Sequence, residues 1–276
     1  MELVIQPNAD RAACLVARLI AQAIREKPHI VLGLATGRTM ERVYRCLVQM
    51  HKHRGLDFSL CRTFNLDEYI GLPADSPFSY RYYMNKHLFS QVNIDRRNTY
   101  LPDGVNADTD RACRQYEQQI HEFGGIDLQL LGIGAAGHIG FNEPLSALQS
   151  RTREKALTPT TIADNAPLCG GDPEKMPRRA ITMGVGTILE AGRVILLATG
   201  TAKANVVAKA VEGPITSMIS ASALQLHRHC RVVVDEEAAA NLQGKEYYRW
   251  IFDNEPEWTV YRTPDCVISG YPPCKT

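Results

Sequence analysis

Five short apolar runs alternate along the chain with segments of helical periodicity, and this alternation restricts the fold more than any other feature. The apolar runs cover residues 30–35, 63–66, 126–134, 194–200 and 230–235. Helices are predicted over residues 8–26, 40–51, 107–123, 202–212 and 236–243. Strands that alternate with helices form a largely parallel sheet covered on both faces, because the crossovers are right-handed. The sequence therefore predicts an α/β fold.

Three of these strands run directly into polar loops. The loops begin at Thr36-Gly-Arg-Thr39, at Asp67-Glu68-Tyr69 and at Gly134-Ala-Ala-Gly-His138. Ligands of parallel α/β sheets bind at the carboxyl ends of the strands. We therefore expect the three loops to form one active site.

Charge and composition exclude several other functions. The formal net charge of the 276 residues is only +1, so the basic surplus of a nucleic-acid-binding protein is missing. Neither a signal peptide nor an apolar stretch long enough to span a bilayer is visible. The eight cysteines are scattered without a C-x-x-C pair, which indicates reduced thiols in a cytoplasmic protein and no zinc site. We expect no membrane partner, no metal and no cofactor.

The length suits a single domain over residues 1–276. Residues 159–177 are rich in Pro, Gly, Thr and Asp and read as a long loop, so we expect a lid over about 145–180. The tail over about 240–276 contains both tryptophans, Trp250 and Trp258. It is predicted either to fold back over the body or to contact another subunit.

The loop over residues 33–39 has the composition of an anion site. Backbone N–H groups at a helix N-terminus attract anions, and the loop adds the hydroxyls of Thr36 and Thr39 and the charge of Arg38. Gly37 gives the loop its freedom to turn, but the Walker and dinucleotide fingerprints are absent. An ordinary tight turn is the alternative interpretation.

Two further loops contain candidates for proton transfer. A carboxylate such as Asp67 or Glu68 in a partly dry cleft has a raised pKa and can act as a base, although an acidic surface turn has the same sequence. His138 can give and take protons near neutral pH, and Glu143 can hold its other ring nitrogen. A purely structural histidine is the alternative at position 138.

Three basic residues elsewhere in the chain are weaker indications of a functional site. Lys203 follows the fourth strand and can supply a charge for a phosphate, although most lysines are simply solvated. His227 and His229 precede the last strand and are interpreted as structural, because a third metal ligand is missing.

Taken together, the motifs resemble the glucosamine-6-phosphate deaminase family. The matching segments are residues 32–39, 64–72, 131–144, 150–153, 180–189 and 222–227. They occur in the family's order up to about residue 235, whereas the tail departs from it. Phosphogluconolactonases share the fold and a similar Gly-His loop, so the motifs identify the family more strictly than the substrate.

The resemblance implies a three-layer αβα, Rossmann-like fold and conversion of glucosamine 6-phosphate and water to fructose 6-phosphate and ammonia. Asp67 would move a proton from C2 to C1, and His138, oriented by Glu143, would open the sugar ring. The resemblance also assigns Thr36, Gly37, Arg38, Thr39 and Lys203 to the phosphate. Ser146, Arg153 and Lys155 match the allosteric site of some members, and an exposed basic pair on a strand is the alternative interpretation of Arg153 and Lys155. It further implies a homo-oligomer.

Two positions depart from the family pattern. Ala136 stands where many members have an aspartate that positions the histidine, and Pro167 stands where many have a phosphate-binding arginine. Arg38 is our candidate to replace that charge. Three other functions fit the same residues: a galactosamine-6-phosphate deaminase, a sugar-phosphate lactonase, and a sugar-phosphate-binding protein without activity.

Overall fold

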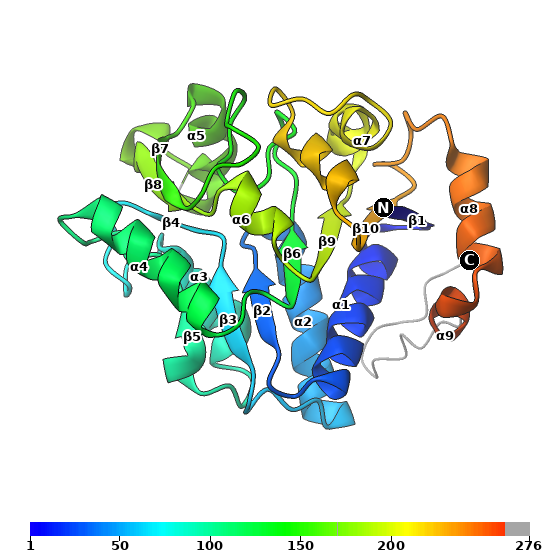
Figure 1. Ribbon diagram of the computed structural model, residues 1–276, viewed down its shortest axis with the longest axis horizontal. Helices are drawn as coiled ribbons and strands as arrows, with labels where there is room; N and C mark the ends of the chain where they lie inside the picture. The colour runs from blue at the N-terminus through cyan, green and yellow to red at the C-terminus, as the bar shows by residue number, and fades with distance from the viewer. Residues whose placement is uncertain (170, 263–276) are drawn as a thin grey trace.

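A seven-stranded parallel sheet forms the centre of the computed structural model, which describes residues 1–169 and 171–262 (Figure 1). The strand order is β1-β10-β9-β6-β2-β3-β5. The strands are β1 (Glu2–Gln6), β2 (Val31–Leu34), β3 (Arg62–Asn65), β5 (Thr99–Tyr100), β6 (Leu128–Leu131), β9 (Arg193–Ala198) and β10 (Cys230–Asp235). Every pairing between them is parallel. The predicted α/β fold is confirmed.

Helices cover both faces of this sheet. Connections that step toward β5 contain α1 (Ala9–Glu26), α2 (Arg38–Arg54), α3 (Tyr80–Met84) and the following π-turn η1 (Asn85–Phe89). Connections that step toward β1 contain α4 (Thr109–Glu122), α6 (Val185–Leu189), α7 (Ala204–Val211) and the 3-10 segment η6 (Ser220–Leu226). Right-handed crossovers in opposite directions place these two groups on opposite faces, which gives three layers.

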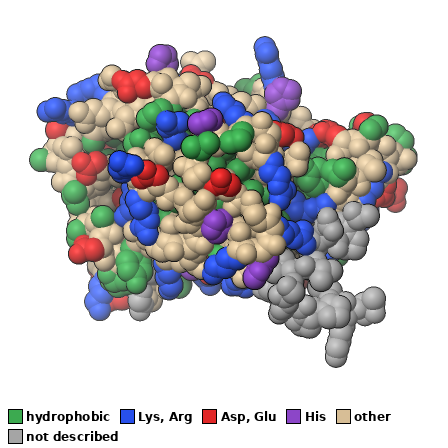
Figure 2. All heavy atoms as spheres, turned by 90° about the horizontal axis from the view of Figure 1, so that it is seen from below, with side chains coloured by type: hydrophobic (Ala, Val, Ile, Leu, Met, Phe, Trp, Pro, Cys, Tyr) green, Lys and Arg blue, Asp and Glu red, His purple; other side chains and the backbone are tan. Residues whose placement is uncertain are grey.

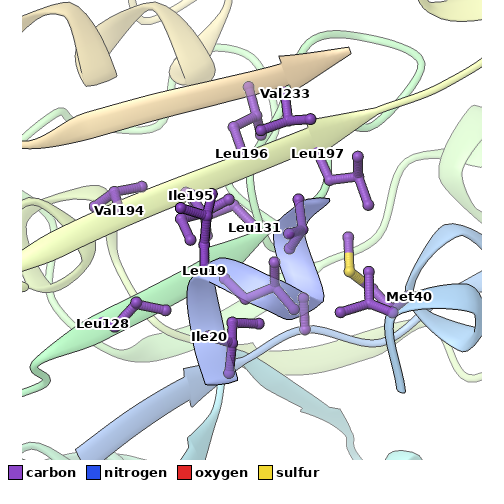
Figure 3. Close-up of a cluster of buried hydrophobic side chains, with 14 of the residues drawn as sticks. Leu19, Ile20, Met40, Leu128, Leu131, Val194, Ile195, Leu196, Leu197 and Val233 are labelled. Atoms are coloured by element: carbon purple, nitrogen blue, oxygen red, sulfur yellow. The ribbon is translucent and has the colours of Figure 1, made fainter. Parts of the chain in front are cut away.

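The core lies between these layers. Leu19 and Ile20 of α1 and Met40 of α2 lie on the side of the sheet where Leu128 of β6 and Ile195 of β9 point (Figure 3). Strands buried on both faces need apolar residues at successive positions, and residues 232–234 are three fully buried valines. The short apolar runs in the sequence have this origin.

The direction of the connections reverses between β2 and β6. The chain leaves β2 toward one face, through α2, whereas the connections that follow β6 lead back toward β1 on the other face. A crevice opens at such a switch point, because the loops of the two neighbouring strands diverge. The loops after β2 and β6 are the two glycine-containing loops singled out in the sequence.

A second, antiparallel sheet lies above the carboxyl ends of these strands (Figure 1). Its order is β4 (Asp67–Tyr69), β8 (Arg179–Thr182) and β7 (Arg153–Ala156). Between β7 and β8 the chain forms α5 (Pro159–Asn165) and two short 3-10 turns, η3 (Ala166–Cys169) and η4 (Pro173–Lys175). The segment predicted as a long loop therefore contains a helix, which begins with the cap Thr158 and with Pro159 in its first turn.

The prediction of a helix over residues 236–243 is wrong. Those residues form turns, and the carboxylate of Asp235 accepts hydrogen bonds from the backbone N–H groups of Gly200 and Ala238. The helix of this region, α8 (Lys245–Asn254), begins later and lies against β1. The sequence analysis also missed β1, β5 and the whole second sheet.

The described part of the tail folds back on the body. After α8 it continues through η7 (Pro256–Trp258) and α9 (Thr259–Arg262), and Trp258 belongs to the main core with no exposed surface. The remaining 3-10 segments of the chain are η2 (Arg96–Asn98) and η5 (Thr201–Lys203). Up to residue 262, the tail therefore folds back over the body, which was the first of the two alternatives.

The molecular surface and the cysteines bear on the expected environment of the protein. Figure 2 shows basic, acidic and histidine side chains scattered among one another on the face opposite the carboxyl ends of the strands. No helix within residues 1–169 and 171–262 is long and apolar enough to cross a bilayer.

Cys46, Cys61, Cys113 and Cys230 are free, whereas Cys14 is disulfide-bonded, so the expectation of reduced thiols throughout is wrong at that position.

Candidate active site

A cleft of about 590 Å³ lies at the carboxyl ends of the central strands. The loops after β2, β3, β6 and β9 contribute to its walls, and α5 contributes from the second sheet. The cleft brings together seven of the predicted residues: Thr36, Gly37, Arg38, Thr39, Asp67, His138 and Lys203. Sequence segments up to 167 residues apart therefore meet at one crevice, as the strand order requires.

The loop after β2 has the geometry of an anion cradle. Gly37 caps α2 with a φ of 112°, a conformation that residues with a side chain rarely adopt. The first N–H groups of the 17-residue helix α2 have no partner within the helix and face outward at its positive end. Tyr83 fixes the turn, since its hydroxyl donates to the carbonyl of Gly37 at 2.8 Å.

Two cationic side chains line the cleft near this loop. Arg38 is exposed in the first turn of α2, and Lys203 follows β9. Burial lowers the pKa of Lys203, and the charge of Asp164 on α5 partly opposes that change. A phosphate in the cleft would therefore meet backbone N–H groups and two cationic side chains, Arg38 from the loop after β2 and Lys203 from the loop after β9.

Asp67 is a buried carboxylate, only 6% exposed, rather than part of a solvated turn. Burial raises its pKa to about 8, and the neighbouring charge of Glu68 adds to the rise. A carboxylate with a pKa near the ambient pH is suited to accept a proton from a weakly acidic carbon.

Glu68 lies on the other side of the strand and has a different role. Its carboxylate accepts hydrogen bonds at 2.9 Å from the backbone N–H groups of Tyr69, Tyr80 and Arg81. These bonds tie β4 to the first turn of α3, and Tyr80 of that turn lines the cleft. The alternative interpretation of residues 67 and 68 as a surface turn is therefore excluded by their burial.

Thr182 of β8 explains why Asp67 and the histidine loop meet. It pairs with Asp67 across the second sheet, and its hydroxyl accepts the backbone N–H of Phe141 at 3.0 Å. Phe141 lies three residues after His138. One residue thus connects the strand of the carboxylate with the loop of the imidazole.

His138 and Glu143 form a pair in this loop. Nδ1 of His138 lies 3.3 Å from Oε2 of Glu143, and both side chains are nearly buried. Burial alone raises the pKa of Glu143, but the nearby imidazole of His138 and hydrogen bonds from Thr161 and Thr158 outweigh burial and lower the pKa to about 2. Glu143 is therefore anionic, and it can hold the proton of Nδ1 and leave Nε2 free to act.

The imidazole packs closely over Gly134. A Cβ atom at this position would lie 2.0 Å from Nε2 of His138, so no larger residue fits. The backbone N–H of Gly134 also donates to the carbonyl of His138 at 2.8 Å. The glycine thus allows the tight loop that turns the imidazole toward the cleft.

The described residues contain no group of three or more His, Cys, Asp and Glu side chains that could hold a metal ion. His227 has a structural environment, since it is buried, its Nε2 lies 2.7 Å from the carbonyl of Ala191 and its Nδ1 accepts the N–H of His229.

Comparison with known proteins agrees with this geometry. The family model for glucosamine-6-phosphate isomerases/6-phosphogluconolactonase matches residues 6–233, which is more than four-fifths of the chain. The chain belongs to this family. A glucosamine-6-phosphate deaminase of Streptomyces coelicolor is 48% identical over 258 residues, which cover 94% of this chain and 99% of that protein. One of Shewanella woodyi is 48% identical and covers 91% and 95%.

Solved structures extend the comparison. A monomeric glucosamine-6-phosphate deaminase superposes with a TM-score of 0.86 at 41% identity, covering 87% of this chain and 100% of that protein. The 6-phosphogluconolactonase of Trypanosoma brucei has a TM-score of 0.71 at 20% identity, covering 87% and 98%. The second likeness shows the shared fold alone.

The two departures from the family pattern lie at different places in the structure. Ala136 has only a methyl group, so Glu143 is the carboxylate that contacts the imidazole of His138. Pro167 is exposed in η3, beyond the end of α5. The residues of α5 that line the cleft are Thr161, Asp164 and Asn165.

The three residues assigned to an allosteric site lie outside the cleft lining. Ser146 is buried, and Arg153 and Lys155 lie two residues apart on β7 and therefore on one face of that strand. Arg153 donates to the side chain of Asn142 at 2.9 Å. An effector role for these residues stays a prediction.

Sequence reasoning missed Thr158 and Thr161, whose hydroxyls both contact Glu143. A local signal was present, since Thr-Pro at 158–159 is typical of a helix start. Tyr80 was missed because nothing in its sequence neighbourhood indicates that α3 turns its first residue toward the cleft.

Proposed function

We propose that this protein is a glucosamine-6-phosphate deaminase that converts glucosamine 6-phosphate and water to fructose 6-phosphate and ammonia. The observation that carries the proposal is a buried carboxylate, Asp67, in the same cleft as His138 and an anion cradle. Lactone hydrolysis needs no base for a C–H bond, so Asp67 favours isomerisation with deamination. Relatives 48% identical over nearly their whole length have this name.

The reaction begins with ring opening. His138 accepts the proton of the C1 hydroxyl and returns one to the ring oxygen, which frees the C1 aldehyde. Glu143 stabilises the imidazolium formed in between. The phosphate meanwhile lies against Thr36, Gly37, Arg38, Thr39 and Lys203.

Proton transfer between carbons follows. The aldehyde acidifies C2, so Asp67 takes the C2 proton while the C1 oxygen takes a proton from the ammonium group at C2, which gives an enol with nitrogen at C2. Asp67 then delivers its proton to C1. The resulting C2 iminium adds water, and the carbinolamine expels ammonia to leave the C2 ketone. Asp67 must be ionised at the start, and its pKa of about 8 makes it a stronger base than an ordinary aspartate, so that it holds the C2 proton until the proton is delivered to C1.

An ammonia-coupled assay with 2-amino sugar 6-phosphates tests this function. We expect ammonia from glucosamine 6-phosphate and formation of fructose 6-phosphate in equal amount. Turnover of the galactosamine epimer alone, hydrolysis of a 6-phosphogluconolactone without ammonia release, or binding without turnover would each replace the proposal by one of its alternatives.

The other predictions remain proposals. We propose a single domain over residues 1–276 with a lid over about 145–180, a location in the cytoplasm, and classification as a hydrolase of C–N bonds in amino-sugar catabolism. A homo-oligomer is also proposed, although one relative of known structure is monomeric. Light scattering of the purified protein tests the oligomeric state.

A further inference from the structure

The carboxylate that orients the histidine is itself held by the lid helix. One oxygen of Glu143, Oε2, faces Nδ1 of His138 at 3.3 Å. The other, Oε1, accepts the hydroxyl of Thr161 at 2.5 Å and that of Thr158 at 3.1 Å. Thr161 is buried at 4% exposure, so its bond is shielded from water.

These bonds fix the direction of the second oxygen. A carboxylate anchored at Oε1 cannot rotate without losing two hydrogen bonds, so Oε2 stays directed at the imidazole. Hydrogen bonds from neutral donors to a buried carboxylate also keep it ionised, in agreement with the lowered pKa of Glu143.

The same hydroxyls build the first turn of α5. Oγ1 of Thr158 accepts the backbone N–H of Thr161 at 3.2 Å, which makes Thr158 the helix cap. A hydroxyl has one proton, so Thr161 gives its proton to Glu143 while Thr158 donates either to Glu143 or to Thr161. Capping of α5 and anchoring of Glu143 therefore depend on one small hydrogen-bonded group.

The helix also reaches the phosphate end of the cleft. Thr161, Asp164 and Asn165 are spaced i, i+3 and i+4, and all three line the cleft from one face of α5. Asp164 interacts electrostatically with Lys203. Lys203 lines the same cleft, so a phosphate held by Lys203 would lie in the space that this face of α5 borders.

The alanine at position 136 increases the importance of this anchor. With a methyl group there, the contact that orients Nδ1 of His138 comes from Glu143. We propose that Thr161, assisted by Thr158, is a positioning residue for the Glu143–His138 pair, and that the docked position of α5 thereby controls ring opening. This inference rests on the proposed deaminase function.

Thr161→Val tests the inference, because it keeps the shape of the side chain and removes the hydroxyl. We expect kcat for glucosamine 6-phosphate to fall by about tenfold or more, since a hydrogen bond to a charged group is lost. Inhibition by an open-chain 2-amino-2-deoxyhexitol 6-phosphate should change less than twofold, because that ligand needs no ring opening. Thr161→Ser should restore most of kcat, and Thr160→Val, at an exposed position of the same turn, is the matched control.

A double-mutant cycle keeps the test decisive if α5 is perturbed. Thr161→Val should have little further effect in a Glu143→Gln background, because the group that it positions has already been altered. Equal, additive losses in both backgrounds, or a parallel loss of inhibitor binding, would overturn the inference. An unmodified protein that releases no ammonia would instead overturn the proposed function.

Discussion

Asp67 combines burial with the need to be charged. Its pKa of about 8 arises from burial first and from the charge of Glu68 second. In the unfolded chain an aspartate has a pKa of about 3.9. Ionisation in the native state is therefore costly, and the protein keeps a destabilising group where the proposed reaction needs a base.

The pH dependence of the reaction follows from this pKa. The base is active only when ionised, so we expect kcat/KM to rise about tenfold per pH unit below about pH 8 and to level off above it. Initial rates of ammonia release between pH 5.5 and 9 measure this rise of kcat/KM. A profile that is flat from pH 6 to 8 would contradict the assignment of Asp67 as the base.

Asp67→Asn separates the two properties of this residue. We expect loss of deamination with sugar-phosphate binding largely intact, because the base acts in the transition state. Since the native pKa is raised, ionisation costs stability as the pH rises from about 4 through about 8. The variant should therefore have a higher Tm than the unmodified protein at pH 9 and a similar one at pH 4. Loss of binding in parallel with activity would count against this role.

Arg38 is a second residue whose contribution, here to phosphate binding, can be tested by a single substitution. We expect Arg38→Ala to raise KM about tenfold with little change in kcat, because a charge-assisted bond to the phosphate is present in both ground and transition states. Steady-state kinetics measure both constants. Arg42→Ala on the same helix is the control, since that side chain pairs with Asp10 at 3.0 Å. An unchanged KM would remove Arg38 from the phosphate site.

At the scale of elements, the loop after β6 depends on close packing of a glycine and an imidazole. Gly134 has an ordinary backbone conformation, so its requirement is space rather than a positive φ. The same loop is linked to the second sheet through Thr182. Its shape thus depends on contacts from both sheets.

Gly134→Ala tests this packing. The added methyl group would lie 2.0 Å from Nε2 of His138, so the imidazole must move. We expect kcat to fall at least a hundredfold, while the far-UV circular dichroism stays unchanged because the sheet itself is not altered. Full activity of Gly134→Ala would exclude His138, in the position described, from the reaction.

At the scale of the whole molecule, the end of the described chain stabilises the edge of the sheet. Trp258 lies against Phe252 and Tyr261, and the guanidinium of Arg231 on β10 lies 4.6 Å from the centre of its ring. Arg231 also bonds to Glu2 and Glu257. Figure 1 shows α8 beside β1, where it covers the edge of the sheet, and α9 follows it along the same side of the molecule.

Trp258→Ala should therefore destabilise the fold without altering the chemistry. Removing a fully buried tryptophan costs about 3–5 kcal/mol, which a urea unfolding curve will detect. KM and kcat should stay near their original values at 25 °C, because Trp258 does not line the cleft. Trp250→Ala is the control, since Trp250 is 56% exposed and its loss should change stability by about 0.5 kcal/mol or less.

The amino-acid sequence alone was enough to predict five of the seven strands of the central sheet and the edge at which the candidate residues meet. Buried parallel strands need continuous apolar runs, and β2, β3, β6, β9 and β10 coincide with such runs. The loops that follow them meet because parallel strands end at one edge of the sheet. Asp67, His138 and the 36–39 loop were therefore recognisable before any coordinates.

The environment of these groups could be seen only in the folded protein. The second sheet has short strands with little periodicity, so neither the burial of Asp67 nor the pairing with Thr182 could be read from the chain. Glu143 is anchored by the hydroxyls of Thr158 and Thr161, which lie 15 and 18 positions further along the chain. Such contacts leave no pattern in the sequence. Periodicity records which residues are buried against the layers, whereas pKa values and hydrogen bonds depend on contacts that form only when the layers have come together.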